Sequence, residues 1–223
     1  MGRVPVLPGA DDVRRCSGRR VILLMIRRWV AVLALAVSAQ AVGDVSIPRA
    51  AHRHRADLEQ YARRYFGPEA QVSRLAAQVH QESAWNEAAR SPVGAENITQ
   101  FMPSTRKWII QKYPTELGGV DYRSGKWALH AQAIYMRDLM SQVRIADTDC
   151  DRWAFALRGY NGGLGYIHTE QKRAERPGNA ESVAVQCYRS AAACRENREY
   201  PIRIMQRIEP AYIQAGWGGS LCK

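Results

Sequence analysis

The sequence predicts a mostly α-helical protein. Apolar residues recur at three- and four-residue spacing over most of the chain from residue 56 onward, which is typical of the buried face of amphipathic helices. No segment alternates apolar and polar residues for more than a few positions, so we expect little or no β-sheet. With 223 residues, 46% of them hydrophobic and 24% charged, the chain is long enough for one domain with a real core and a short leader.

The expected helices follow one another between turn-forming residues. Gly67-Pro68 closes the first helix, Ser104 can cap the third, Pro114 ends it, and Gly159 ends the fifth. In chain order, the expected helices span residues 56–66, 69–82, 104–113, 125–143, 149–158, 180–194 and 199–215. Residues 86–103 are rich in turn formers and are expected to form a long loop between the second and third helices.

The first 41 residues have the composition of a secretory leader. Arg27 and Arg28 precede the apolar run 29–37, and small residues follow at Ala39 and Ala41. This order of positive, apolar and small residues is that of a signal peptide. We therefore expect export to the periplasm, with cleavage after Ala41.

Two alternatives stay open for this segment. Met25 lies just before the arginine pair, so translation starts either there or at Met1. An uncleaved leader would tether the protein to the membrane, although the apolar run is short for a bilayer span of about 20 residues. Either way, we expect transient membrane contact through the leader, a linker over residues 42–55 and a catalytic domain over residues 56–223.

The cysteines agree with export. Apart from Cys16 in the leader, the chain has Cys150, Cys187, Cys194 and Cys222, which allow two disulfides in three connectivities. Cys187 and Cys194 are close enough for a local loop, which would leave Cys150 to tie the C-terminus to the domain. No pair of cysteines or histidines has the spacing of a zinc site, so we expect no metal.

The net charge of +11 is divided between the leader and the domain. Residues 1–41 carry +5, from seven arginines and two aspartates, and the remaining residues carry +6. A basic domain suits an acidic polymer such as nucleic acid, lipopolysaccharide or cell wall, and is equally compatible with a merely solvated surface. Export, and the lack of a basic stripe with interleaved aromatic residues, argue against nucleic acid.

Glu82 is an unusual carboxylate. It follows Val79 by three residues and Leu75 by seven, which places it on the apolar face of its helix near the C-terminal end. Burial and the helix dipole both disfavour a negative charge there, so its pKa should rise toward that of a general acid. The alternative is a glutamate at a frayed helix end that turns to solvent.

Five short segments follow one another along the chain: Gln-Glu-Ser-Ala-Trp-Asn at 81–86, Ser-Pro-Val-Gly-Ala at 91–95, Thr-Gln-Phe-Met-Pro at 99–103, Gly-Tyr-Asn-Gly-Gly at 159–163 and Glu-Asn-Arg-Glu-Tyr at 196–200. In this order they resemble the motifs of the soluble lytic transglycosylase (SLT) domain family, which is goose-lysozyme-like. The similarity extends over about residues 58–213, with Asn197 where the family has Thr and residues 97–99 (Asn-Ile-Thr) where it has Gly-Leu-Met.

The resemblance implies a lysozyme-like helical domain with a cleft, and roles for individual residues. Glu82 would be the catalytic acid and then the base. Ser83 would orient Glu82 or the substrate; the alternative is a polar residue at the helix end. Gln100 would bind saccharide through its amide, and Met102 would line the groove by apolar contact or belong to the core.

Three further residues would complete the site. Tyr160 would place its hydroxyl beside Glu82, and Asn161 would contact an N-acetyl group or fix its loop. Glu196 would lie at the inner end of the cleft and position Tyr160, or instead pair with Arg198 or Arg203. Other aromatic residues could stack on sugars or belong to the core; they are Trp85, Trp108 and Tyr166.

The implied reaction cleaves the β-1,4 bond between N-acetylmuramic acid (MurNAc) and N-acetylglucosamine (GlcNAc) in peptidoglycan, forming 1,6-anhydro-MurNAc. We expect a monomer acting on glycan strands without a cofactor, in wall remodelling or phage lysis. A hydrolytic muramidase is the alternative on the same fold, with Glu87, Glu96 or Asp121 positioning water. A non-catalytic wall-binding protein is the alternative of another class.

Overall fold

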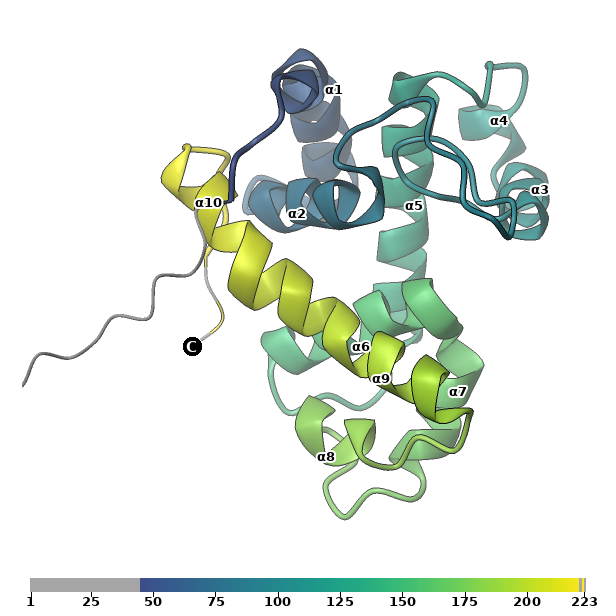
Figure 1. The fold of residues 1–223 in the computed structure, drawn as a ribbon, viewed down its shortest axis with the longest axis vertical. Helices are drawn as coiled ribbons and strands as arrows, with labels where there is room; N and C mark the ends of the chain where they lie inside the picture. The colour runs from purple at the N-terminus through teal and green to yellow at the C-terminus, as the bar shows by residue number, and fades with distance from the viewer. Residues whose placement is uncertain (1–44, 221, 223) are drawn as a thin grey trace, which may run out of the picture. The chain divides into compact units, whose positions relative to one another are not determined.

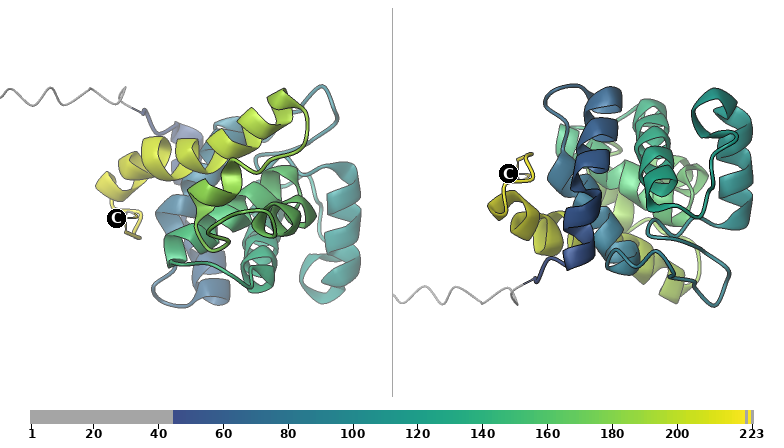
Figure 2. Two further views of the ribbon diagram at one scale, coloured as in Figure 1. Left: turned by 90° about the horizontal axis from the view of Figure 1, so that it is seen from below. Right: turned by 90° about the horizontal axis from the view of Figure 1, so that it is seen from above.

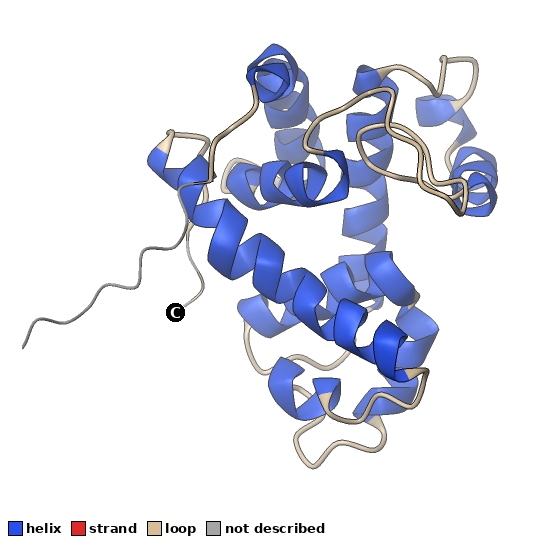
Figure 3. Ribbon diagram, in the orientation of Figure 1, coloured by secondary structure: helices blue, strands red, loops and turns tan. Residues whose placement is uncertain are grey.

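The computed structural model describes residues 45–220 and 222, so the predicted leader 1–41 lies outside the described residues. Within them the chain is helical and has no β-strand beyond two isolated bridges (Figure 3), which confirms the predicted fold class. The helices are α1 Arg49–Phe66, α2 Val72–Ser83, α3 Pro103–Lys112, α4 Pro114–Leu117, α5 Gly125–Gln142, α6 Asp149–Gly162, α7 Leu164–Gln171, α8 Ala180–Ala184, α9 Ala191–Ile202, the π-helix η1 Arg203–Ile208 and α10 Glu209–Gln214.

Helices α9, η1 and α10 form one almost continuous rod that crosses the domain (Figure 1). Its N-terminal part packs against α6, and its C-terminal part packs against α2. Pro201 lies inside α9, and the π-helical segment η1 begins two residues after it. The rod therefore brings residues near position 200 to the end of α2.

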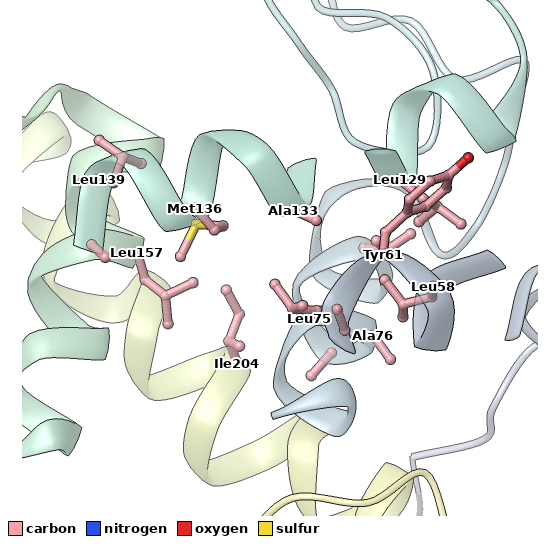
Figure 4. Packing of buried hydrophobic residues seen from close by; sticks show 14 of the residues in the cluster. Leu58, Tyr61, Leu75, Ala76, Leu129, Ala133, Met136, Leu139, Leu157 and Ile204 are labelled. Carbon is pink, nitrogen blue, oxygen red and sulfur yellow. The ribbon is translucent and has the colours of Figure 1, made fainter. Parts of the chain in front are cut away.

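The core lies around α5, which packs on α1 along one side and α6 along another. Leu75 of α2, Met136 of α5 and Leu157 of α6 are fully buried, and Ile204 of η1 joins them from the rod (Figure 4). Burial of each such side chain contributes about 1.5–3 kcal/mol. Helices α3 and α4 lie on the flank away from α10 in both views of Figure 2, beyond the long loop that follows α2.

Helix α2 ends abruptly because two successive non-glycine residues have positive φ. Ala84 has φ 49° and Trp85 has φ 66°, a conformation that costs L-residues about 1–3 kcal/mol each and persists only where other contacts impose it. The contacts here are those of Trp85, which is 1% exposed and donates from Nε1 to the Tyr212 hydroxyl at 2.7 Å. This anchored turn fixes Glu82 in the last turn of α2.

The linker predicted for residues 42–55 is wrong from residue 49 onward, where α1 begins. The alternating histidines and arginines suggested a solvated tail, but they make tertiary contacts. His54 stacks on Trp85, and the Arg55 guanidinium lies over Trp217 and donates to the Gly216 carbonyl at 2.6 Å. Because these contacts join residues that are far apart in the sequence, a local sequence pattern does not predict them.

Three other boundaries also differ from prediction. Helix α6 continues through Gly159 to Gly162, and a Cβ at position 159 would lie 3.1 Å from the Leu164 side chain and 3.4 Å from that of Leu139. Pro114 begins the short helix α4, in the first-turn position where its missing N–H costs nothing. The helix predicted over 180–194 is instead α8, a loop and the start of α9, while α7 was not predicted at all.

Both expected disulfides are present, which confirms the pairing inferred from spacing. Cys187 and Cys194 close a short loop before α9, and Cys150 bonds Cys222 across 72 residues. The second bond ties the chain end to the start of α6. In the described part of the chain, no helix is both long and apolar enough to cross a membrane.

Candidate active site

Glu82 accepts a hydrogen bond from the Tyr200 hydroxyl, which connects the end of α2 to the C-terminal rod. Burial of the carboxyl group raises the pKa of Glu82 from 4.5 to about 7. The Tyr200 bond opposes this rise in pKa, the negative charge of Glu196 adds to it, and the positive charge of Arg203 opposes it. Glu82 can therefore hold a proton near neutral pH and release it again.

Tyr200 is held by a chain of buried amides. Gln132 donates from Nε2 to the side-chain oxygen Oε1 of Gln78 at 2.9 Å. Gln78 in turn donates from Nε2 to the hydroxyl oxygen of Tyr200 at 3.4 Å. Because the amide of Gln78 supplies the donor, the Tyr200 proton is left for Glu82. Burial raises the pKa of Tyr200 well above its usual value, so this hydroxyl stays neutral and donates.

The sequence prediction gave the contact with Glu82 to Tyr160, whereas Tyr200 makes it. The Tyr160 hydroxyl donates instead to the Thr99 carbonyl at 2.7 Å, and its ring packs on Phe101 and Tyr135. Burial raises the pKa of Tyr160 well above its usual value, and the charge of Glu82 adds to this effect. Tyr160 therefore joins α6 to the loop after α2, near Glu82. Tyr200 is the final residue of the last motif, at 196–200, and its place in that motif was the sequence signal that could have identified it as a partner of Glu82.

Ser83 and Gln100 both stabilise the loop between α2 and α3. Ser83 donates from Oγ to the Ile98 carbonyl at 2.8 Å. Gln100 has φ 51° and donates from Nε2 to the carbonyls of Ala89 and Asn97, at 3.1 and 2.7 Å. The NH₂ group of Gln100 is thus used within the loop, so the predicted hydrogen bond to a saccharide would have to be accepted by its side-chain oxygen. Met102, which precedes α3, is 38% exposed and is not part of the core.

Asn161 and Glu196 lie on either side of the contact between α6 and α9. Asn161 is exposed in the last turn of α6 and accepts a hydrogen bond from Asn197 Nδ2 at 3.0 Å. The Glu196 side chain is 55% exposed and pairs with Arg203 at 2.5 Å. Glu196 does not contact Tyr160; the observed pairing with Arg203 was the alternative.

The three carboxylates considered for a hydrolytic route are engaged elsewhere. Glu87 accepts from His54 at 3.0 Å, and Glu96 pairs with Arg90 and Arg106. Asp121 accepts from the backbone N–H of Arg123 at 3.0 Å. In the part of the chain that the structure describes, the carboxylate whose charge acts on Glu82 is Glu196.

Other features of the described residues bear on ligands. They contain no cluster of three His, Cys, Asp or Glu side chains able to hold a metal ion. Trp85 belongs to the core, whereas Trp108 and Tyr166 are 41% and 42% exposed. A cavity of about 170 Å³ lies beside the loop after α2; its lining includes Glu87, Arg90, Glu96, Arg106, Tyr122 and Arg123.

Comparison with known proteins gives a consistent result. The chain is 31% identical over 106 residues to membrane-bound lytic murein transglycosylase F of Shewanella frigidimarina (strain NCIMB 400), a match covering 47% of this chain. It spans about a fifth of the length of that relative. Among solved structures, an inactive variant of lytic transglycosylase Slt from Pseudomonas aeruginosa matches with a TM-score of 0.58 and 22% identity, over 74% of this chain and 25% of the other.

A complex of the 70-kDa soluble lytic transglycosylase with bulgecin A matches with a TM-score of 0.56 and 21% identity, over 74% of this chain and 25% of the other. At these identities the two structures show a shared fold. The family model named transglycosylase SLT domain matches residues 61–183, which is more than half of the chain. The resemblance seen in the motifs is thereby confirmed, and the chain belongs to the transglycosylase SLT domain family.

Proposed function

We propose that the protein cleaves the β-1,4 bond between MurNAc and GlcNAc in peptidoglycan without water, using Glu82 as acid and then as base. The observation that carries this proposal is the carboxyl group of Glu82, whose pKa is about 7 and which is held by the Tyr200 hydroxyl. A group with this pKa is about half protonated at neutral pH, which suits proton transfer in both directions.

In the first step, protonated Glu82 gives its proton to the glycosidic oxygen, and the bond from that oxygen to C1 of MurNAc breaks. Positive charge develops at C1. The carbonyl oxygen of the sugar's own 2-acetamido group can stabilise C1, so a second protein carboxylate is not needed on the opposite face. Glu82 is left ionised, and the Tyr200 hydroxyl donates to the new carboxylate.

In the second step, the Glu82 carboxylate takes the proton of the C6 hydroxyl of the same MurNAc. The C6 oxygen bonds to C1 and displaces the acetamido oxygen, which closes the 1,6-anhydro ring. Glu82 regains its proton, and no water is consumed. Among the described residues, Glu87, Glu96 and Asp121 are not among the charges that act on Glu82, which favours this route over the hydrolytic one.

Substrate and location belong to the same proposal. The relative from Shewanella is named a membrane-bound lytic murein transglycosylase, and the signal-like leader supports export to the periplasm. Glycan strands are the proposed partner, in wall remodelling or phage lysis, and the protein acts as a monomer without a cofactor. Since the 70-kDa soluble enzyme forms a complex with bulgecin A, we expect this compound to compete with glycan strands here.

Mass spectrometry of the muropeptides released from purified peptidoglycan tests the proposal. Wild-type protein should release 1,6-anhydro-MurNAc products, and Glu82→Gln should release none while staying folded. Free reducing ends in place of anhydro products would establish a muramidase. Binding to peptidoglycan without any released product, equal in wild type and Glu82→Gln, would establish a non-catalytic binding protein.

A further inference from the structure

A buried network of polar side chains connects α9 to the exposed Asn161 at the end of α6. Asn197 accepts from Arg158 Nε at 3.1 Å and donates from Nδ2 to the Arg158 carbonyl at 2.8 Å. The same Nδ2 group donates to Asn161 Oδ1 at 3.0 Å. Arg158 and Asn197 are each 1% exposed, and Arg158 is paired with the fully buried Glu170. The network is thus fixed at its inner end by an ion pair.

The chemistry of Arg158 determines which way both asparagine amides point. A guanidinium group only donates, so the Asn197 atom that faces it must be the carbonyl oxygen. The NH₂ group of Asn197 then faces the Arg158 carbonyl and Asn161. Because a donor faces Asn161, the oxygen of Asn161 must point inward and its NH₂ group outward. Within residues 45–220 that NH₂ group has no hydrogen-bond acceptor, and Asn161 is exposed.

The amide of Asn197 is needed to make both of these donated hydrogen bonds. A threonine hydroxyl has one proton and could not donate to both the Arg158 carbonyl and Asn161, as the Asn197 amide does. Gly162 leaves room for this amide and for the Arg189 guanidinium, since a Cβ at position 162 would lie 2.7 Å from Asn197 Nδ2 and 2.5 Å from Arg189 Nη1. Both observations point to a dedicated arrangement.

We propose that Asn197 is a positioning residue that turns the NH₂ group of Asn161 outward, so that Asn161 selects a hydrogen-bond acceptor on the ligand. In the glycan of the proposed reaction, on which this inference rests, that acceptor is the carbonyl oxygen of an acetamido group. Asn161 touches the ligand, and Asn197 acts through it. The sugar amine left by removal of the acetyl group offers no such carbonyl and is disfavoured.

The test compares binding of the GlcNAc tetramer with binding of the same tetramer after removal of its acetyl groups. All proteins carry Glu82→Gln, so that no bond is cleaved, and dissociation constants are measured by calorimetry. Asn197→Asp keeps the shape but loses the donor, and its carboxylate should draw the Asn161 NH₂ group inward. The preference for the acetylated tetramer should then fall roughly 2- to 12-fold, the range of one neutral hydrogen bond.

Asn161→Ala should reduce the preference by a similar factor, and the combination with Asn197→Asp should reduce it no further, because one contact is lost in each case. Gln171→Glu is the matched control. Gln171 is a buried amide that donates to the carbonyls of Ile145 and Pro177, both at 2.9 Å. Its conversion to an acid should lower stability and leave the preference unchanged. An unchanged preference in Asn197→Asp, or a loss as large in the control, overturns the proposal.

Hydrogen exchange of the side-chain amides, followed by nitrogen-15 NMR, gives a readout that needs no ligand. The Asn197 NH₂ group should be protected and that of Asn161 exposed, and Asn197→Asp should protect Asn161. Protection of Asn161 in the starting protein overturns the inference. If wild-type protein releases no muropeptide, the proposed function fails instead, and the exchange pattern still decides the orientation. If the wild-type protein cleaves peptidoglycan but Asn197→Asp does not change the preference for the acetylated tetramer, the proposed function holds and the proposed role of Asn197 is wrong.

Discussion

The raised pKa of Glu82 has a consequence for stability as well as for catalysis. In the unfolded chain the carboxyl group has its ordinary pKa of 4.5, whereas in the folded protein the pKa is about 7. Between these values the unfolded chain loses its proton while the folded protein keeps it. The unfolded state is therefore favoured increasingly as the pH rises from 4.5 to 7, and the penalty stays constant above that.

Glu82→Gln removes this penalty, because the neutral amide has nearly the same shape and can still accept from Tyr200. Each pH unit between the two pKa values costs folding about 1.4 kcal/mol, so the full penalty is about 3 kcal/mol. At pH 5 the variant should be close to the wild type in stability. At pH 8 it should be more stable by about 3 kcal/mol, a large fraction of the 5–15 kcal/mol typical of a domain.

Urea unfolding at pH 5 and pH 8, with the disulfides intact, measures the difference. The quantity of interest is the change in stability caused by Glu82→Gln at pH 8 minus the change at pH 5, since effects of other titrating groups cancel. Glu175→Gln, at an exposed loop position, is the control and should give a difference near zero. A variant that gains the same amount at both pH values, or loses stability at pH 8, would refute a raised pKa caused by burial.

Three further predictions concern the surroundings of Glu82 and the frame of the fold. Tyr200→Phe removes the hydrogen bond that lowers the pKa of Glu82, so the alkaline limb of the pH–rate profile should move to higher pH. The maximal rate should fall roughly 10- to 150-fold, the effect of losing one hydrogen bond to a charged group. An alkaline limb that does not move would contradict the contact between Tyr200 and Glu82. Gly162→Ala places a Cβ 2.5 Å from Arg189 Nη1 and 2.7 Å from Asn197 Nδ2 and should cost about 1–3 kcal/mol in urea unfolding. An unchanged midpoint would mean that both side chains move aside freely. Replacing both cysteines of the Cys150–Cys222 bond by serine opens a loop of 72 residues. The free energy of unfolding should fall by about 4 kcal/mol because the unfolded chain gains entropy. A fall of less than 1 kcal/mol would show that the chain end is held by its other contacts.

Local sequence determined much of the fold. The three- and four-residue spacing of apolar residues predicted the helices, because an amphipathic helix must bury one face. It also placed Glu82 on the apolar face near a helix end, where burial raises the pKa. The short separation of Cys187 and Cys194 favoured their pairing among three connectivities, and the structure has that pairing. Each of these conclusions depends on residues that are near one another in the chain.

What the sequence left undecided depends on residues far apart. Which tyrosine bonds Glu82 is decided by the path of the C-terminal rod, which brings Tyr200 across 118 positions to α2 and leaves Tyr160 on Thr99. Helix α1 begins at Arg49, and its residues His54 and Arg55 contact tryptophans that are distant in the sequence. A hydrogen bond needs its atoms about 3 Å apart, and helix periodicity fixes the face of a side chain without fixing which distant helix meets it. The tertiary structure alone supplied the partner of Glu82.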